Sequence, residues 1–151
     1  MEYAVRRATL EDAGRIASLF DAYRQFYGKP PEPEVARRFI QARLAAGESV
    51  IFLAAARDGE TLGFVQLYPS FSSVEARPLW VLNDLYVGQE VRGLGVGRAL
   101  MEAAKKHAVE TGAKRLTLET AEDNRTAWSL YESLGYASRG PSTRFYELEL
   151  D

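Results

Sequence analysis

The spacing of apolar and polar residues along the chain predicts a short strand followed by two helices. The first strand is expected at residues 3–7. Apolar residues then recur at helical spacing over 13–23, behind Thr9 and Asp12, which are placed as in a capping box. A second helix is expected from about 33 to 47, since it has a proline at its start and a glycine at its end.

The middle of the chain predicts strands instead. They are expected at 50–56, 62–68 and 79–87. Asp58-Gly59 is a strong hairpin signal between the first two of them. A loop containing Pro69 and Pro78 is expected between the second and the third.

The last third predicts two more helices and two more strands. The helices are expected at 95–111 and 124–134, and the strands at 114–120 and 145–150. The whole order, β-α-α-β-β-β-α-β-α-β, indicates an α/β fold with a mixed sheet and helices on both of its faces. No linker or repeat interrupts the pattern, so residues 1–151 are interpreted as a single domain.

Composition narrows the function classes. The chain has no cysteine and one histidine, which excludes disulfides and acyl-cysteine intermediates and predicts no metal centre. No run approaches the ~20 apolar residues of a membrane span, and the N-terminus has no signal-peptide core. With a net charge of −2 and mixed signs, we expect a cytoplasmic protein that binds neither membrane nor nucleic acid.

Three alternate glycines, Gly93, Gly95 and Gly97, connect the strand at 79–87 with the following helix. Glycine lets the backbone turn tightly and approach a ligand with no Cβ in the way. The free amides of a first helical turn and the positive end of the helix dipole favour a diphosphate. Arg92 and Arg98 add charged donors at either end. The pattern therefore predicts a phosphate site.

Three other interpretations of this glycine loop are a P-loop, a dinucleotide-binding loop and a turn without a ligand. A P-loop is excluded because Gly97 is followed by Arg98-Ala99 and not by Lys-Ser/Thr. The loop also misses the third glycine of a dinucleotide fingerprint, although Glu119 lies where a ribose-binding acid would be expected. A tight strand-to-helix turn with no ligand is the remaining alternative.

Two motifs together resemble the GCN5-related N-acetyltransferase (GNAT) superfamily. The first is Arg92-x-x-Gly95-x-Gly97, and the second is Asn124-x-x-Ala127-x-x-Leu130-Tyr131-x-x-x-Gly135-Tyr136. They are separated by one helix and one strand, as in that family. The resemblance is strong from Trp80 to Tyr136, and the 82–87 strand is similar to the branch with histone and polyamine acetyltransferases.

The resemblance implies a mostly antiparallel central sheet whose middle strands, 79–87 and 114–120, splay apart around the pantetheine arm of acetyl-coenzyme A. One strand amide among 85–87 would stabilise the oxyanion. The residues implied in cofactor binding are Leu85, Tyr86, Val87, Arg92, Gly93, Leu94, Gly95, Val96, Gly97, Arg98, Asn124, Ala127 and Tyr131.

Tyr131 is the implied general acid, which would protonate the departing thiolate. Its alternative role is that of a half-buried aromatic on an amphipathic helix. In the polyamine branch a glutamate can act as the base, but the matching position here is Asn83, which cannot accept the proton. Asp84 and Glu119 remain candidates for the base, and each has an ordinary ion pair as its alternative. His107 is expected on a solvated helix face.

The acceptor amine is expected beside the aromatic segment that follows the first helix. The candidate residues are Tyr23, Tyr27, Asn83, Asp84 and Glu119, and residues 68–73 are expected to line the same pocket. Simple packing of the aromatics on the core is the alternative.

The predicted function is acetyl transfer from acetyl-CoA to a primary amine by direct attack in a ternary complex. The amine is expected to be a small molecule, polyamine or amino acid rather than a protein lysine. A non-catalytic acyl-CoA-binding module, acting as a sensor or regulatory subunit, is the alternative. A homodimer through the 145–150 strand is also allowed.

Overall fold

The computed structural model describes residues 2–151, apart from the side chain of Pro141, as two compact units. The first unit extends to Glu119 and holds the sheet, and the second begins at Thr120. The strands are β1 (Tyr3–Arg7), β2 (Val50–Ala56), β3 (Thr61–Ser72), β4 (Arg77–Val87) and β5 (Leu116–Thr117). The helices are α1 (Ala13–Phe26), α2 (Pro33–Ala46), α3 (Val96–Glu110) and α4 (Arg125–Ser133).

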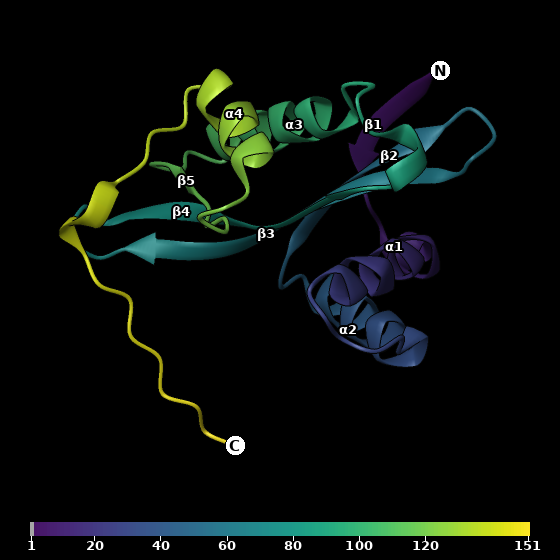
Figure 1. Cartoon of the computed structure of the whole chain (residues 1–151), viewed down its shortest axis with the longest axis horizontal. Helices are drawn as coiled ribbons and strands as arrows, with labels where there is room; N and C mark the ends of the chain where they lie inside the picture. Colours follow the sequence, from purple (N-terminus) through teal and green to yellow (C-terminus); the bar gives the residue numbers. More distant parts are fainter. Residues whose placement is uncertain (1) are drawn as a thin grey trace. The chain divides into compact units, whose positions relative to one another are not determined.

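The five strands form one mixed sheet in the order β1-β2-β3-β4-β5. Neighbouring strands are antiparallel from β1 to β4, and β5 runs parallel to β4. Within the first unit, α1 and α2 cover one face of the sheet and α3 covers the other (Figure 1). The predicted α/β class, with a mostly antiparallel sheet and helices on both faces, is confirmed.

Alternation along the strands builds a core on each side of the sheet. Ile51, Leu53 and Phe64 pack with Ile16 of α1 and Ile40 of α2 on one face, and each of the five is fully buried. The intervening residues face α3. These two cores hold β4 and the start of α3 in place, and both elements contribute to the site.

The predicted helix ends are largely confirmed, because they carry local signals. The carboxylate of Asp12 accepts a hydrogen bond from the Thr9 amide at 2.8 Å, as expected of a capping box. Asp12 also accepts two bonds from Arg6, which hold the pKa of this buried carboxyl at about 2. Gly47 ends α2 with a φ of 63°, a conformation that glycine adopts without strain.

The predicted loop with Pro69 and Pro78 is wrong, because both prolines lie inside a long β3–β4 hairpin. Pro69 pairs with Trp80, whose amide donates to the carbonyl of Arg115 just before β5, so this pair is not hydrogen-bonded across the hairpin. The backbone nitrogen of Pro69 therefore points away from β4. On that side β2 ends its pairing at Leu67, so the missing N–H interrupts no ladder.

The final strand predicted at 145–150 is also wrong. The described chain has neither helix nor strand after Ser142, and Phe145, Tyr146, Leu148 and Leu150 are exposed. A strand needs an edge to pair with, and β5, at the edge of the described sheet, is only two residues long instead of the predicted 114–120. None of the helices described between residues 2 and 151 combines the length and apolarity needed to cross a bilayer.

Candidate functional site

The edge of β4 opens where the glycine loop begins. β5 pairs with β4 only at Trp80 and Val81, so within the described sheet no strand lies beside residues 82–87 on that side. The predicted splaying of the two middle strands is therefore visible in the pairing. Such an edge presents backbone donors and acceptors that an extended ligand can use.

The direction of the β4 amides follows from the pairing with β3. The Gly88 amide donates to the Leu62 carbonyl at 2.9 Å, and antiparallel residues alternate between bonding their partner and facing away from it. The backbone of Tyr86 is therefore also hydrogen-bonded to β3. Leu85 and Val87 direct their amides and carbonyls to the open edge. Of the three residues 85–87 predicted to bind the cofactor, these two direct their amides to the open edge, where Arg92 contacts the Val87 carbonyl.

Beyond β4, the glycine loop leads directly into α3. Gly93 and Gly95 have φ angles of 83° and 82°, in the left-handed region where side chains are strained. The first turn of α3 contains no acidic residue, and Ala99 donates to the Gly95 carbonyl at 3.0 Å. The amides of Val96 and Gly97 precede that bond and have no partner within the helix. The loop thus presents free amides at a helix N-terminus, the arrangement that favours an anion.

The two flanking arginines differ in their surroundings. The Nε of Arg92 donates to the Val87 carbonyl at 3.2 Å, and its guanidinium lies 5.6 Å from the centre of the Tyr86 ring. The Arg92 side chain therefore connects the glycine loop to the end of β4. Its guanidinium charge remains at the surface. Arg98 lies exposed in the first turn of α3. Both positions are compatible with the predicted phosphate contacts.

In the second unit, the Asn124 motif forms the start of α4. The Oδ1 of Asn124 accepts a hydrogen bond from the Ala127 amide at 3.2 Å, so this side chain caps the helix. Tyr131 is half-buried, and its ring centre lies 6.2 Å from that of Tyr136. The motif is therefore helical, as predicted, and Asn124 has a structural role besides any role toward a ligand.

Asp84 is the centre of a polar cluster beneath α1. The side chain is 5% exposed and points to the same sheet face as Tyr86. Its carboxylate accepts hydrogen bonds from Gln66 Nε2 at 2.8 Å and from Asn83 Nδ2 at 3.2 Å. The phenol of Tyr23 lies close enough for the charge of Asp84 to raise its pKa. The structure therefore brings together three predicted acceptor residues, Tyr23, Asn83 and Asp84.

Aromatic rings surround this cluster. The ring centre of Tyr23 lies 5.1 Å from that of Tyr27, 5.9 Å from that of Tyr86 and 6.0 Å from that of Phe64. Tyr23 lies within α1 and packs on the core, whereas Tyr27 is 63% exposed. Tyr23 thus shows the core packing that was the alternative, whereas Tyr27 leaves its ring at the surface.

The phenols near Asp84 are held in their neutral form. Burial, followed by the negative charge of Asp84, raises the pKa of Tyr23 far above its usual value. The same two causes, in the same order, raise the pKa of Tyr68 to about 12, and the charge of Arg43 opposes them. Both phenols are therefore hydrogen-bond donors near neutral pH.

The structure separates Glu119 from the polar cluster at Asp84 and adds Gln66 to it. Glu119 is exposed, lies beyond the end of β5, and makes no described contact with Asp84 or with the tyrosines around it. Gln66 was missed by the sequence analysis, although it is fully buried and lies opposite Asp84 in the β3–β4 register. A lone polar residue inside the apolar run 62–68 was the available signal.

The prediction for His107 was wrong. Its ring is half-buried on α3, 5.7 Å from that of Phe52 and 5.0 Å from that of Trp80, because position 107 turns toward the sheet beside the buried Ala104 and Ala108. Its Nε2 is buried and has no hydrogen-bond partner among the described residues. Burial, and then the charge of Arg7, lower the pKa of His107 below 6.5.

We expect the fold to lose stability as the pH falls from 7 toward 5. The unfolded chain binds a proton at His107 near pH 6.5, but the folded chain does so only at lower pH, so stability is present above 6.5 and falls below it. His107 is the one histidine of the sequence, so a single proton limits the slope to about 1.4 kcal/mol per pH unit. Thermal unfolding of His107→Gln should show a smaller decrease in this window. Equal pH dependence in both proteins would contradict the assignment.

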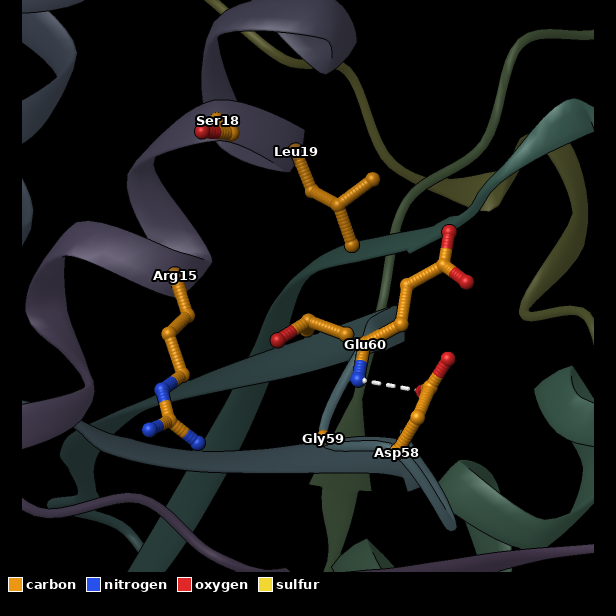
Figure 2. Close-up of a pocket in the computed structure, with 7 residues that line it drawn as sticks. Arg15, Ser18, Leu19, Asp58, Gly59 and Glu60 are labelled. Carbon is orange, nitrogen blue, oxygen red and sulfur yellow. Dashed lines mark hydrogen bonds between the residues drawn. The ribbon is translucent and has the colours of Figure 1, made fainter.

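A hollow of about 480 Å³ lies apart from these groups, between α1 and the β2–β3 turn. Figure 2 shows Arg15 reaching from α1 toward the turn, where the Glu60 amide donates to the Asp58 carboxylate at 2.9 Å. None of the residues lining this hollow is a predicted site residue. The candidate site is therefore the open edge and glycine loop, not the hollow.

Comparison with known proteins agrees with this fold. Residues 16–136 match the Acetyltransferase (GNAT) family. The chain is 48% identical over 132 residues to YhfO of Bacillus subtilis, an uncharacterised N-acetyltransferase, covering 87% of this chain and 88% of the relative. It is 29% identical to an aminoglycoside N(6')-acetyltransferase type 1 of Stenotrophomonas maltophilia, covering 87% of this chain and 84% of that enzyme.

A solved structure supports the same assignment. The crystal structure of a probable acetyltransferase superimposes with a TM-score of 0.90 at 42% identity, covering 98% of both chains. The chain belongs to the GNAT family, and it is an acetyltransferase.

Proposed function

We propose that this enzyme transfers the acetyl group of acetyl-CoA to the primary amine of a small molecule, by direct attack in a ternary complex. The observation that carries the proposal is the open β4 edge at Leu85 and Val87, which continues into the left-handed glycines and the first turn of α3. An extended arm that ends in a diphosphate matches this sequence of backbone donors.

The loop residues fit such a ligand. No heavy atom lies within 4 Å of the position that a Cβ would take on Gly93, and on Gly95 only the Tyr3 hydroxyl does, at 3.8 Å. The backbone is thus accessible to a ligand. We assign cofactor binding to the predicted residues of the loop and of β4, and to Asn124, Ala127 and Tyr131 of the second motif.

Bound acetyl-CoA supplies the acetyl group as an activated thioester. With the arm bound along the β4 edge, the amide of Leu85 or Val87 would be the donor for a negatively charged thioester oxygen. Tyr131 would be the proton donor for the thiolate, as the second motif implies. Cysteine is absent, so direct attack is favoured over an acyl-cysteine route.

The ammonium of the acceptor must lose a proton before it attacks. Asp84 and Glu119 are the two proposed acceptors of that proton. Asp84 is the better supported, because it lies buried among Tyr23, Asn83 and Gln66, whereas Glu119 is exposed. The aminoglycoside acetyltransferase similarity favours a small-molecule amine over a protein lysine.

Thiol release tests the proposal. The protein is incubated with acetyl-CoA and single amines, and free coenzyme A is measured with a thiol reagent, while mass spectrometry detects the acetylated amine. We expect amine-dependent thiol release, and none with the alcohol of the same carbon skeleton. If coenzyme A raises the melting temperature but no amine releases thiol, the non-catalytic binding module gains support. Stabilisation by NAD and not by coenzyme A would contradict both.

A further inference from the structure

Asp84 is a buried carboxylate for which the described part of the chain provides no cationic partner. Its hydrogen-bond donors, Gln66 and Asn83, are both neutral. Buried aspartates are rare unless they are paired, because the loss of water leaves their charge poorly compensated. Asp84 therefore retains a strong attraction for a positive charge.

Another buried aspartate of the same chain shows the contrast. Asp12 is 4% exposed, and Arg6 contacts both of its oxygens, at 2.7 and 2.8 Å. The fold thus neutralises Asp12 with its own arginine. Asp21, which is 8% exposed, also accepts hydrogen bonds only from neutral donors, Gln25 Nε2 and the Glu32 amide. What sets Asp84 apart is the unpaired acceptor on the residue beside it, Gln66, and the two together point to a cation from outside the chain.

Gln66 gives an independent indication of a ligand. Its side chain is fully buried, and its Nε2 donates to Asp84 at 2.8 Å, so the carboxylate fixes the orientation of the amide. The remaining oxygen, Oε1, is buried and accepts no hydrogen bond from any described group. An unpaired buried acceptor costs about 1–3 kcal/mol. A carboxylate and an unpaired amide oxygen together suit the three N–H donors of an ammonium group.

The rings around Asp84 limit the rest of the ligand. Tyr23, Tyr86 and Phe64 provide aromatic surfaces, which bind apolar groups and attract a cation through their faces. The described side chains that hydrogen-bond to Asp84 are uncharged amides, and the rings that surround the cluster are also uncharged. A second ammonium would therefore find no acidic partner in this cluster.

We propose that Asp84 and Gln66 bind the ammonium group of the acceptor, and that the acceptor is a compact amine with one positive charge and an apolar body. This inference rests on the proposed function, because it names the substrate class of the same site. Gln66 acts both as an acceptor for the ammonium and as a positioning residue for Asp84.

Calorimetric titration of the coenzyme A-bound full chain tests the inference with three ligands: 2-phenylethylamine, its neutral counterpart 2-phenylethanol, and spermidine. We expect 2-phenylethylamine to bind at least tenfold more tightly than either of the others. Asp84→Asn and Gln66→Met should weaken its binding about tenfold, with the Kd of coenzyme A unchanged. Asp12→Asn, the matched buried aspartate, should lower the Tm and leave the amine Kd unchanged. In turnover, Gln66→Met should raise the KM for the amine more than it lowers kcat.

Tighter binding of spermidine, no binding of 2-phenylethylamine, or unchanged amine affinity in Gln66→Met would each overturn the inference. The comparison of ligands on the unmodified protein decides it even if a variant does not fold. Acetylation of spermidine in preference to the monoamine would refute this inference and leave the proposed function intact. Asp84-dependent amine binding without thiol release would refute the proposed function and leave the binding centre intact.

Discussion

Replacement of Tyr131 by phenylalanine is expected to lower kcat for acetyl transfer by about 10²–10⁴-fold, the usual contribution of a positioned general acid. The ring and its packing are retained, so the Kd of coenzyme A should change little. Steady-state thiol release and calorimetry of the same protein preparation measure the two quantities.

Tyr136→Phe is the matched control for Tyr131→Phe. The two rings are neighbours, with centres 6.2 Å apart, so both substitutions remove a hydroxyl from the same part of the second unit. We expect Tyr136→Phe to retain kcat within a few-fold. Equal kcat values for Tyr131→Phe and the unmodified enzyme would exclude the tyrosine as the acid.

The double substitution Gly93→Ala and Gly95→Ala is expected to weaken coenzyme A binding about tenfold or more per residue. Each new side chain meets open space, so the effect comes from the backbone: the left-handed conformation costs about 1–2 kcal/mol for a residue with a Cβ. The loop should therefore leave the conformation that directs its amides toward a diphosphate. Calorimetric titration with coenzyme A measures the change.

Gly59→Ala provides the control for this loop. Gly59 has a φ of 93° and also open space at its Cβ, but it lies in the β2–β3 turn. Its substitution should lower the Tm about half as much as the double substitution and leave the Kd of coenzyme A unchanged. If Gly59→Ala weakened binding as much as the loop variant does, a general loss of stability would explain both results.

The helices and the glycine loop could be predicted from the sequence because their signals are local. The Thr9–Asp12 box, the proline and glycine that bound α2, and the strand-to-helix glycines all act within a few residues. Helix boundaries are therefore correct to within a few residues. The second motif likewise forms a helix where the resemblance implied one.

The errors and omissions concern contacts between distant segments. The contact between Gln66 and Asp84 forms only when β3 pairs with β4, because the two residues are 18 positions apart in sequence. The alternation at 145–150 is typical of a strand, yet the segment has no strand partner in the described chain. The neighbours Lys105 and Lys106 predict a solvated His107, but the helix turns its ring toward Phe52. Spacing along one segment does not determine such contacts.

Nitrogen-15 amide spectra of the full chain, titrated with coenzyme A, test the central claim most directly. We predict saturable shifts concentrated at the amides of Gly93, Gly95 and Gly97 and at those of Leu85 and Val87, with little change around the β2–β3 turn. Absence of saturable shifts at the glycine amides, or shifts confined to the hollow between α1 and that turn, would contradict it.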